Sequence, residues 1–231
     1  MFFDPMYLLF ALPGLLFALY ASFTTKTTFA KYSKVMSSTG VSGAEAAARL
    51  LRDAGIHDVG IEMADGFLSD HYDPSAKMLR LSSAVYNGRS LSSIGVACHE
   101  AGHAIQHAEN YAPLGMRSAL VPLAGISSPL SYVFILIGFL FNSPNFILFG
   151  ALVFSAAVLF SIVTLPVEYN ASARAKRLMV SAGIVSSREA EDAGAVLNAA
   201  FMTYVAAAVS AILTLLYYLW RSGIFGGRSN D

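Results

Sequence analysis

Four long apolar runs constrain what this chain can fold into. They cover residues 6–23, 120–141, 146–165 and 201–220, and each is close to the ~20 residues that a helix needs to cross a lipid bilayer. Hydrophobic residues make up 55% of the chain and charged residues 13%, which is about half the charged share of a soluble domain. The sequence therefore predicts a mainly α-helical, multi-pass membrane protein with about four transmembrane helices.

The boundaries of these runs refine that prediction. Asp4 is the only charge before the first run, and residues 18–21 lack the small-x-small spacing of a cleavage site, so the first run is interpreted as an uncleaved anchor. An uncharged turn at 142–145 joins the second and third runs into a helical hairpin, in which Pro122 and Pro129 favour a kinked or partly re-entrant second run. The fourth run ends in aromatic residues, which are typical of a membrane interface.

The basic residues lie almost entirely on one side of this arrangement. Of the 15 lysine and arginine residues, only Arg221 and Arg228 lie on the other side. Because positively charged flanks such as Lys26 stay in the cytoplasm, we expect a plasma (inner) membrane protein whose hydrophilic insert is cytoplasmic. The net charge of +0, with no polybasic patch, argues against nucleic acid as a partner. The single cysteine, Cys98, precludes an intrachain disulfide.

The hydrophilic insert at 26–117 is interpreted as a small α+β unit. Residues 42–45 (Ser-Gly-Ala-Glu) form a capping box that predicts a helix ended by Gly55. Two strands are expected at 61–64 and 77–81, joined around 70–74. Further helices are predicted from Ser90 or Ser92 to about Asn110, and from about Ser187 into the fourth apolar run.

The motif His99-Glu100-Ala101-Gly102-His103 falls on the helix predicted after Ser90. Residues i and i+4 share a helix face, so both imidazoles can reach one metal ion. Glu100 lies ~100° further round the helix, where it can accept a proton from metal-bound water. Gly102 leaves room for a neighbouring helix or a substrate. The pattern therefore favours a metal site over a coincidental polar face.

A catalytic zinc takes three protein ligands and keeps its fourth position for water. His107 is ~12 Å along the helix from His99, so it is interpreted as a surface residue or as a partner of a ligand. Glu168 is the first charged residue after Arg117, and two membrane crossings between His103 and Glu168 return the chain to the side it left. We therefore expect Glu168 to be the third ligand rather than a glutamate that merely lies at the interface.

Several stretches spread over essentially the whole chain carry a family resemblance: 70–74, 79–82, 85–90, 94–96, 99–106, 165–168 and 203–208. They are similar to the bacterial membrane neutral zinc metallopeptidase family often called YugP-like. The resemblance implies a zincin-type catalytic unit whose site Glu168 completes. The chain is also more distantly similar to membrane glutamate-zincins of the CAAX-protease and stress-protease type. Those proteins usually carry an aspartate four residues after the ligand glutamate, and this aspartate orients a histidine. This chain has Ser172 at that position.

The predicted function is a membrane-embedded endopeptidase in which one Zn²⁺ held by His99, His103 and Glu168 activates water, with Glu100 as general base. Its partners would be a peptide or protein substrate and the lipid bilayer. The strand at 78–82 is interpreted as a half-buried strand of the sheet, with an edge strand that pairs with an extended substrate as the alternative. Candidates for further contacts with the substrate or transition state are His71, Tyr72, Tyr169 and Arg174.

Three other classes of protein compete with this function. An intramembrane metalloprotease would need a polar ligand inside a later span, and 146–165 and 201–220 contain no Asp or Glu. A scaffold with a structural metal would close its site with four protein ligands. A transporter would carry ionisable residues within its spans. The predicted division of the chain is an N-terminal anchor at 1–25, the catalytic α+β region at 26–117, the hairpin at 118–165, the third-ligand segment at 166–200, and a C-terminal transmembrane helix with its tail at 201–231.

Overall fold

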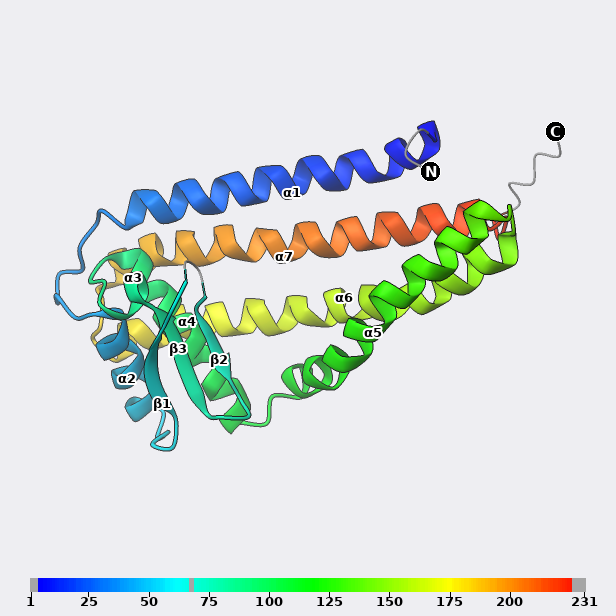
Figure 1. Cartoon of the computed structure of the whole chain (residues 1–231). Helices are drawn as coiled ribbons and strands as arrows, with labels where there is room; N and C mark the ends of the chain where they lie inside the picture. Colours follow the sequence, from blue (N-terminus) through cyan, green and yellow to red (C-terminus); the bar gives the residue numbers. More distant parts are fainter. Residues whose placement is uncertain (1–3, 67–68, 226–231) are drawn as a thin grey trace. The chain divides into compact units, whose positions relative to one another are not determined.

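The computed structural model of the chain describes residues 4–66 and 69–225. Residues 1–3 of the predicted anchor and the predicted tail at 226–231 lie outside the described residues. Helices account for 74% of the structure, and three strands form one small sheet, so the predicted fold class is confirmed. The elements shown in Figure 1 are α1 (Pro5–Tyr32), α2 (Gly43–Asp53), β1 (Gly60–Ala64), β2 (His71–Asp73), β3 (Met78–Ser82), α3 (Ser83–Tyr86), α4 (Leu91–Ala108), α5 (Ala112–Leu140), α6 (Pro144–Ser181) and α7 (Ser187–Arg221).

The four predicted apolar runs lie in α1, α5, α6 and α7. Among the described residues, these are the helices long and apolar enough to cross a membrane. Large apolar side chains such as Leu9, Ile126 and Leu140 are exposed on them, and lipid is the solvent that suits such a surface. α5 continues as one helix through Pro122 and Pro129.

The chain divides into two compact units. The first, which we call the apolar unit, comprises Met1–Ala21, Met116–Leu165 and Thr203–Asp231. The second, which we call the sheet unit, comprises Ser22–Gly115 and Pro166–Met202. The motif at 99–103 and the predicted third ligand, Glu168, therefore belong to the same unit, although they are far apart in the sequence.

Within the apolar unit, α5 and α6 form the predicted helical hairpin. A Cβ added at Gly150 of α6 would lie 3.0 Å from the backbone oxygen of Ser131 in α5, so the two helices pack closely at this point. Ile135 and Ile147 are buried in the same core as Tyr217 of α7. The hairpin and α7 thus share one apolar core.

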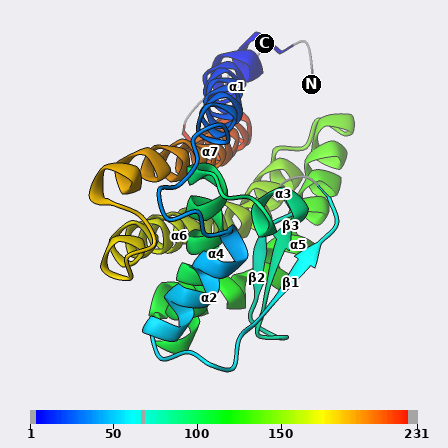
Figure 2. The same ribbon diagram turned by 90° about the vertical axis from the view of Figure 1, so that its left-hand side faces the viewer.

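The sheet has the strand order β1-β3-β2, with β3 parallel to β1 and antiparallel to β2 (Figure 2). The prediction of two strands joined around 70–74 was incomplete, because β2 lies inside that segment. Asp73 Oδ1 accepts hydrogen bonds from the backbone N–H groups of Ser75 and Ala76, so the turn follows β2 instead of replacing it. β3 is paired on both sides and its residues are buried or half-buried, so 78–82 is the expected half-buried strand and not the edge strand that was its alternative.

The motif helix α4 is the centre of the sheet unit. Ser90 is its N-cap and accepts a hydrogen bond from the backbone N–H of Ser93. Both the sheet and α2 pack against α4 (Figures 1 and 2), and Ala97 and Ala101 of α4 are fully buried with Leu50 of α2 in one core. The capping box predicted for α2 is present. Because α4 is packed on several sides, the backbone from which the motif side chains extend is held in place.

Candidate metal centre

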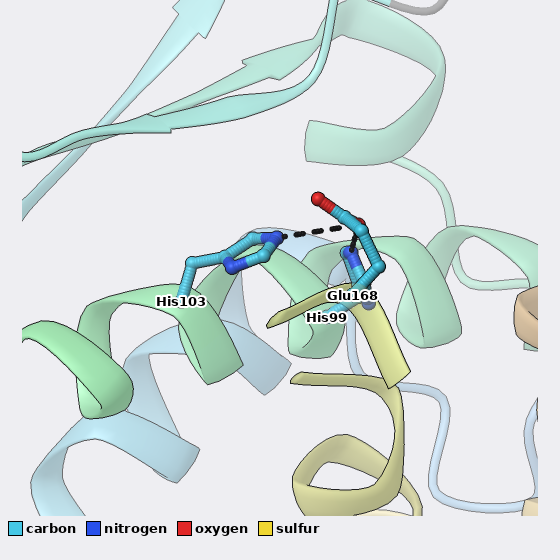
Figure 3. A group of neighbouring side chains, drawn as sticks. All are labelled: His99, His103 and Glu168. Carbon is cyan, nitrogen blue, oxygen red and sulfur yellow. Dashed lines mark hydrogen bonds and ion pairs between the residues drawn. The ribbon is translucent and has the colours of Figure 1, made fainter. Parts of the chain in front are cut away.

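Two imidazoles and one carboxylate converge in the sheet unit (Figure 3). His99 and His103 extend from successive turns of α4, and Glu168 extends from α6. One ligand atom from each residue lies within 4.8 Å of the other two. The Oε2 atom of Glu168 is 3.2 Å from His99 Nε2 and 3.6 Å from His103 Nε2. The structure thus brings the three predicted ligands together.

The geometry and the donor set fit a zinc ion. Tetrahedral zinc with bonds of ~2.0–2.1 Å holds neighbouring ligand atoms about 3.3 Å apart, close to the two measured separations of 3.2 and 3.6 Å. Glu168 is only 2% exposed, and a buried carboxylate is costly unless opposite charge or hydrogen bonds compensate it. Two imidazoles and a carboxylate are also ligands that zinc prefers.

The electrostatic surroundings of His103 are strongly negative. Burial alone lowers the pKa of its imidazole, but the hydrogen bond to Glu168 and the nearby Glu100 and Glu168 carboxylates outweigh burial and raise the pKa above its usual value. Glu100 is itself buried and acts on His103 from the same helix. The site is therefore built to hold positive charge, whether as a proton or as a cation.

Close contact between α4 and α6 is what places Glu168 beside the histidines. A Cβ added at Gly102 would lie 2.8 Å from the backbone oxygen of Ala171 and 3.3 Å from its carbonyl carbon. These are backbone atoms, so a side chain at Gly102 cannot be accommodated by moving one rotamer. A neighbouring helix therefore fills the space beside the glycine of the motif. The sequence predicts either a neighbouring helix or a substrate there.

We expect Gly102→Ala to destabilise the sheet unit by about 1–3 kcal/mol, the usual cost of overpacking, and to weaken zinc binding by separating α4 from α6. Thermal unfolding in detergent and competition with a zinc chelator measure the two effects. Gly115→Ala is the matched control, because nothing lies within 4 Å of a Cβ there, and alanine is the better helix former. Wild-type values for Gly102→Ala would contradict the close approach.

Each histidine has a second partner at its Nδ1 atom. His99 Nδ1 is 3.1 Å from Ser172 Oγ, so Ser172, which stands where the more distantly similar glutamate-zincins usually carry an aspartate, contacts a histidine. His103 Nδ1 is 3.0 Å from Gln106 Oε1. Sequence reasoning missed Gln106, although it stands three residues after His103, on the same helix face.

The contacts of the remaining predicted site residues are with groups other than the three ligand atoms. His71 Nδ1 bonds the backbone oxygen of Ser69, which is the local turn contact given as its alternative. The hydroxyl of Tyr72 is 2.8 Å from His107 Nδ1, and both line a pocket of about 220 Å³. Tyr169 is 63% exposed. Arg174 pairs with Glu109 at 2.6 Å and donates to Asn170 Oδ1 at 2.7 Å.

Comparison with known proteins gives consistent results. A family model described as "Putative neutral zinc metallopeptidase" matches residues 7–223. The chain is 46% identical over 200 residues to "Putative membrane protease YugP" of Bacillus subtilis (strain 168), an alignment that covers 87% of this chain and 89% of that relative. No solved structure matches the chain significantly.

Proposed function

The chain belongs to the neutral zinc metallopeptidase family, and on this premise we propose that it is a membrane-embedded zinc endopeptidase with Glu100 as its general base. One zinc ion would be held by His99, His103 and Glu168. The observation that carries the proposal is the convergence of the two motif imidazoles with a carboxylate from α6, at separations of 3.2 and 3.6 Å. Such an arrangement leaves a fourth position for water.

Zinc bound at this site would lower the pKa of a water molecule toward ~7 and polarise the peptide carbonyl. The role of the protein's own residues in this reaction would be to move protons. Glu100 follows His99 directly on α4 and lies ~100° round the helix from it, so its carboxylate can face the reacting water without binding the metal. It would accept the proton of that water and pass it to the leaving amine. The products are a free carboxylate and a free amine.

Two features favour a catalytic over a structural metal. A structural site would be closed by four protein ligands, whereas the group found among the described residues has three members. The relative from Bacillus subtilis is described as a membrane protease, which agrees with hydrolysis. The apolar runs 146–165 and 201–220 carry no acidic residue, which favours chemistry outside the bilayer core over intramembrane cleavage.

The location proposed for the site is the cytoplasmic side of the cell membrane. Four helices are long and apolar enough to span it among the residues that are described. Lys26 and Arg174 flank the first and third apolar runs on the side that carries the catalytic residues, and positively charged flanks of this kind remain cytoplasmic. Glu168 follows the third run by three residues, so the substrate would be cut close to the membrane surface.

Removal of the metal tests this function directly. The protein purified in detergent should contain about one zinc per chain, and treatment with 1,10-phenanthroline should abolish its cleavage of fluorescently labelled casein. Adding zinc back should restore cleavage. The matched control is 1,7-phenanthroline, which has the same ring system but does not chelate. Cleavage at an undiminished rate after zinc has been removed, as measured by mass spectrometry, would exclude a zinc mechanism.

A further inference from the structure

Gln106 connects one of the metal-binding histidines to the helix that carries Glu168. Its side chain is fully buried between α4 and α6. The Oε1 atom lies 3.0 Å from His103 Nδ1, and the Nε2 atom lies 2.8 Å from the backbone oxygen of Val167 and 3.0 Å from Asn170 Oδ1. All the hydrogen-bonding capacity of the amide nitrogen is therefore used toward α6.

The orientation of this amide is fixed by its neighbours. The carbonyl oxygen of Val167 can only accept a hydrogen bond, so the amide nitrogen must face it. Arg174 provides a second, independent constraint, because a guanidinium only donates and its Nε atom donates to Asn170 Oδ1 at 2.7 Å. Asn170 thus presents its oxygen to Gln106, which again requires the amide nitrogen there.

It follows that the oxygen of Gln106 faces His103. An oxygen acceptor 3.0 Å from Nδ1 requires that Nδ1 carry a proton. Since a neutral imidazole has one N–H, the lone pair must then be on Nε2, the nitrogen that lies 3.6 Å from Glu168 Oε2. We propose that Gln106 is a positioning residue that holds His103 in the Nδ1–H tautomer and directs its Nε2 lone pair to the metal. This inference rests on the proposed zinc site.

The neighbouring histidine lacks an equivalent constraint. Ser172 Oγ lies 3.1 Å from His99 Nδ1, but a hydroxyl can donate or accept, so it accommodates either tautomer of His99. The chain Arg174–Asn170–Gln106–His103, in contrast, begins at a group that can only donate. Arg174 is held in turn by Glu109 at the end of α4. Arg174 therefore acts on the site through this network, and its contact with a transition state stays a prediction.

The tautomer of His103 is measurable without metal. In metal-free wild-type protein labelled with ¹⁵N-histidine, in detergent, long-range nitrogen–proton spectra should show a protonated Nδ1 for His103, whether or not its Nε2 also carries a proton toward Glu168. Comparison with His103→Gln identifies its signals. A bare Nδ1 would overturn the inference. Because the measurement needs no metal, it decides the inference even if the chain binds no zinc. Absence of zinc binding would refute only the proposed function.

Zinc affinity, measured by competition with a chromophoric chelator, provides the second readout. Gln106→Met keeps the size of the side chain but removes the acceptor, and should weaken zinc binding by about 10–100-fold, the typical cost of losing a partner of a metal-bound histidine. Asn170→Asp retains an acceptor for both donors and should bind zinc nearly as wild type does. Asn198→Leu removes an exposed amide and is the control. Wild-type affinity in a folded Gln106→Met protein would overturn the inference.

Discussion

Replacing Glu100 by glutamine should lower kcat for peptide hydrolysis by about 10²–10⁴-fold, the contribution expected of a general base. Glutamine has nearly the same shape as glutamate, but its amide cannot take a proton from water at neutral pH. The three ligand atoms belong to His99, His103 and Glu168, so the substitution leaves all of them in place. Zinc content should therefore remain at the wild-type value while catalysis is lost. Initial rates on labelled casein and metal analysis of the same sample measure both quantities.

The matched control is Glu191→Gln, which makes the same chemical change at an exposed position of α7. It should cleave casein at the wild-type rate. A Glu100→Gln protein that keeps both its zinc and its activity would refute the assignment of the base. Loss of zinc from that variant would instead place Glu100 among the residues that hold the metal.

The helical part of the fold was predictable because its signals are local. Lipid imposes one requirement on each span, a run of apolar residues of the right length, and that requirement can be read without knowledge of any partner segment. The capping box at Ser42 and the N-cap at Ser90 are equally local, since each depends on a side chain and a backbone group within three residues. These features were found from the sequence alone.

The sheet was less predictable because its order depends on partners far along the chain. β2 has three residues, too few for alternation to appear, and the turn-forming Asp73 at its end and Pro74 after it concealed the strand. Whether β3 is an edge strand depends on β1, which precedes it and lies parallel to it. The residues of one strand do not show how many neighbouring strands it has, so the sequence left open whether 78–82 is an edge strand.

For the candidate site, the residue types of the ligands could be predicted, but their supporting contacts could not. His99 and His103 share a helix face by spacing alone, and Glu168 stands out as the one carboxylate after a long uncharged stretch. Gln106 is a buried side chain whose partners lie on α6, more than 60 residues later in the chain. Its contact with His103 lies within α4, but only the packing of α4 against α6 fixes which end of its amide faces that histidine.

The substitution Glu168→Gln should cost more zinc affinity than any other change discussed above except loss of a ligand histidine. The carboxylate is the only negatively charged member of the three-residue group and is 2% exposed, so an amide in its place removes both a ligand and the charge that balances the cation. We expect zinc binding to weaken by more than the about 10–100-fold that loss of an outer partner costs. Peptide hydrolysis should disappear with the metal.

Glu100→Gln and Glu168→Gln form a matched pair, because the same exchange of carboxylate for amide is made at two buried positions of one site. The first should retain zinc and lose catalysis, whereas the second should lose both. Circular dichroism and thermal unfolding of the metal-free proteins separate loss of metal from loss of fold. If Glu168→Gln binds zinc as tightly as the wild type does, the carboxylate beside His99 and His103 is not a ligand. The two motif imidazoles would then require a third ligand from elsewhere, and the proposed peptidase site would have to be abandoned.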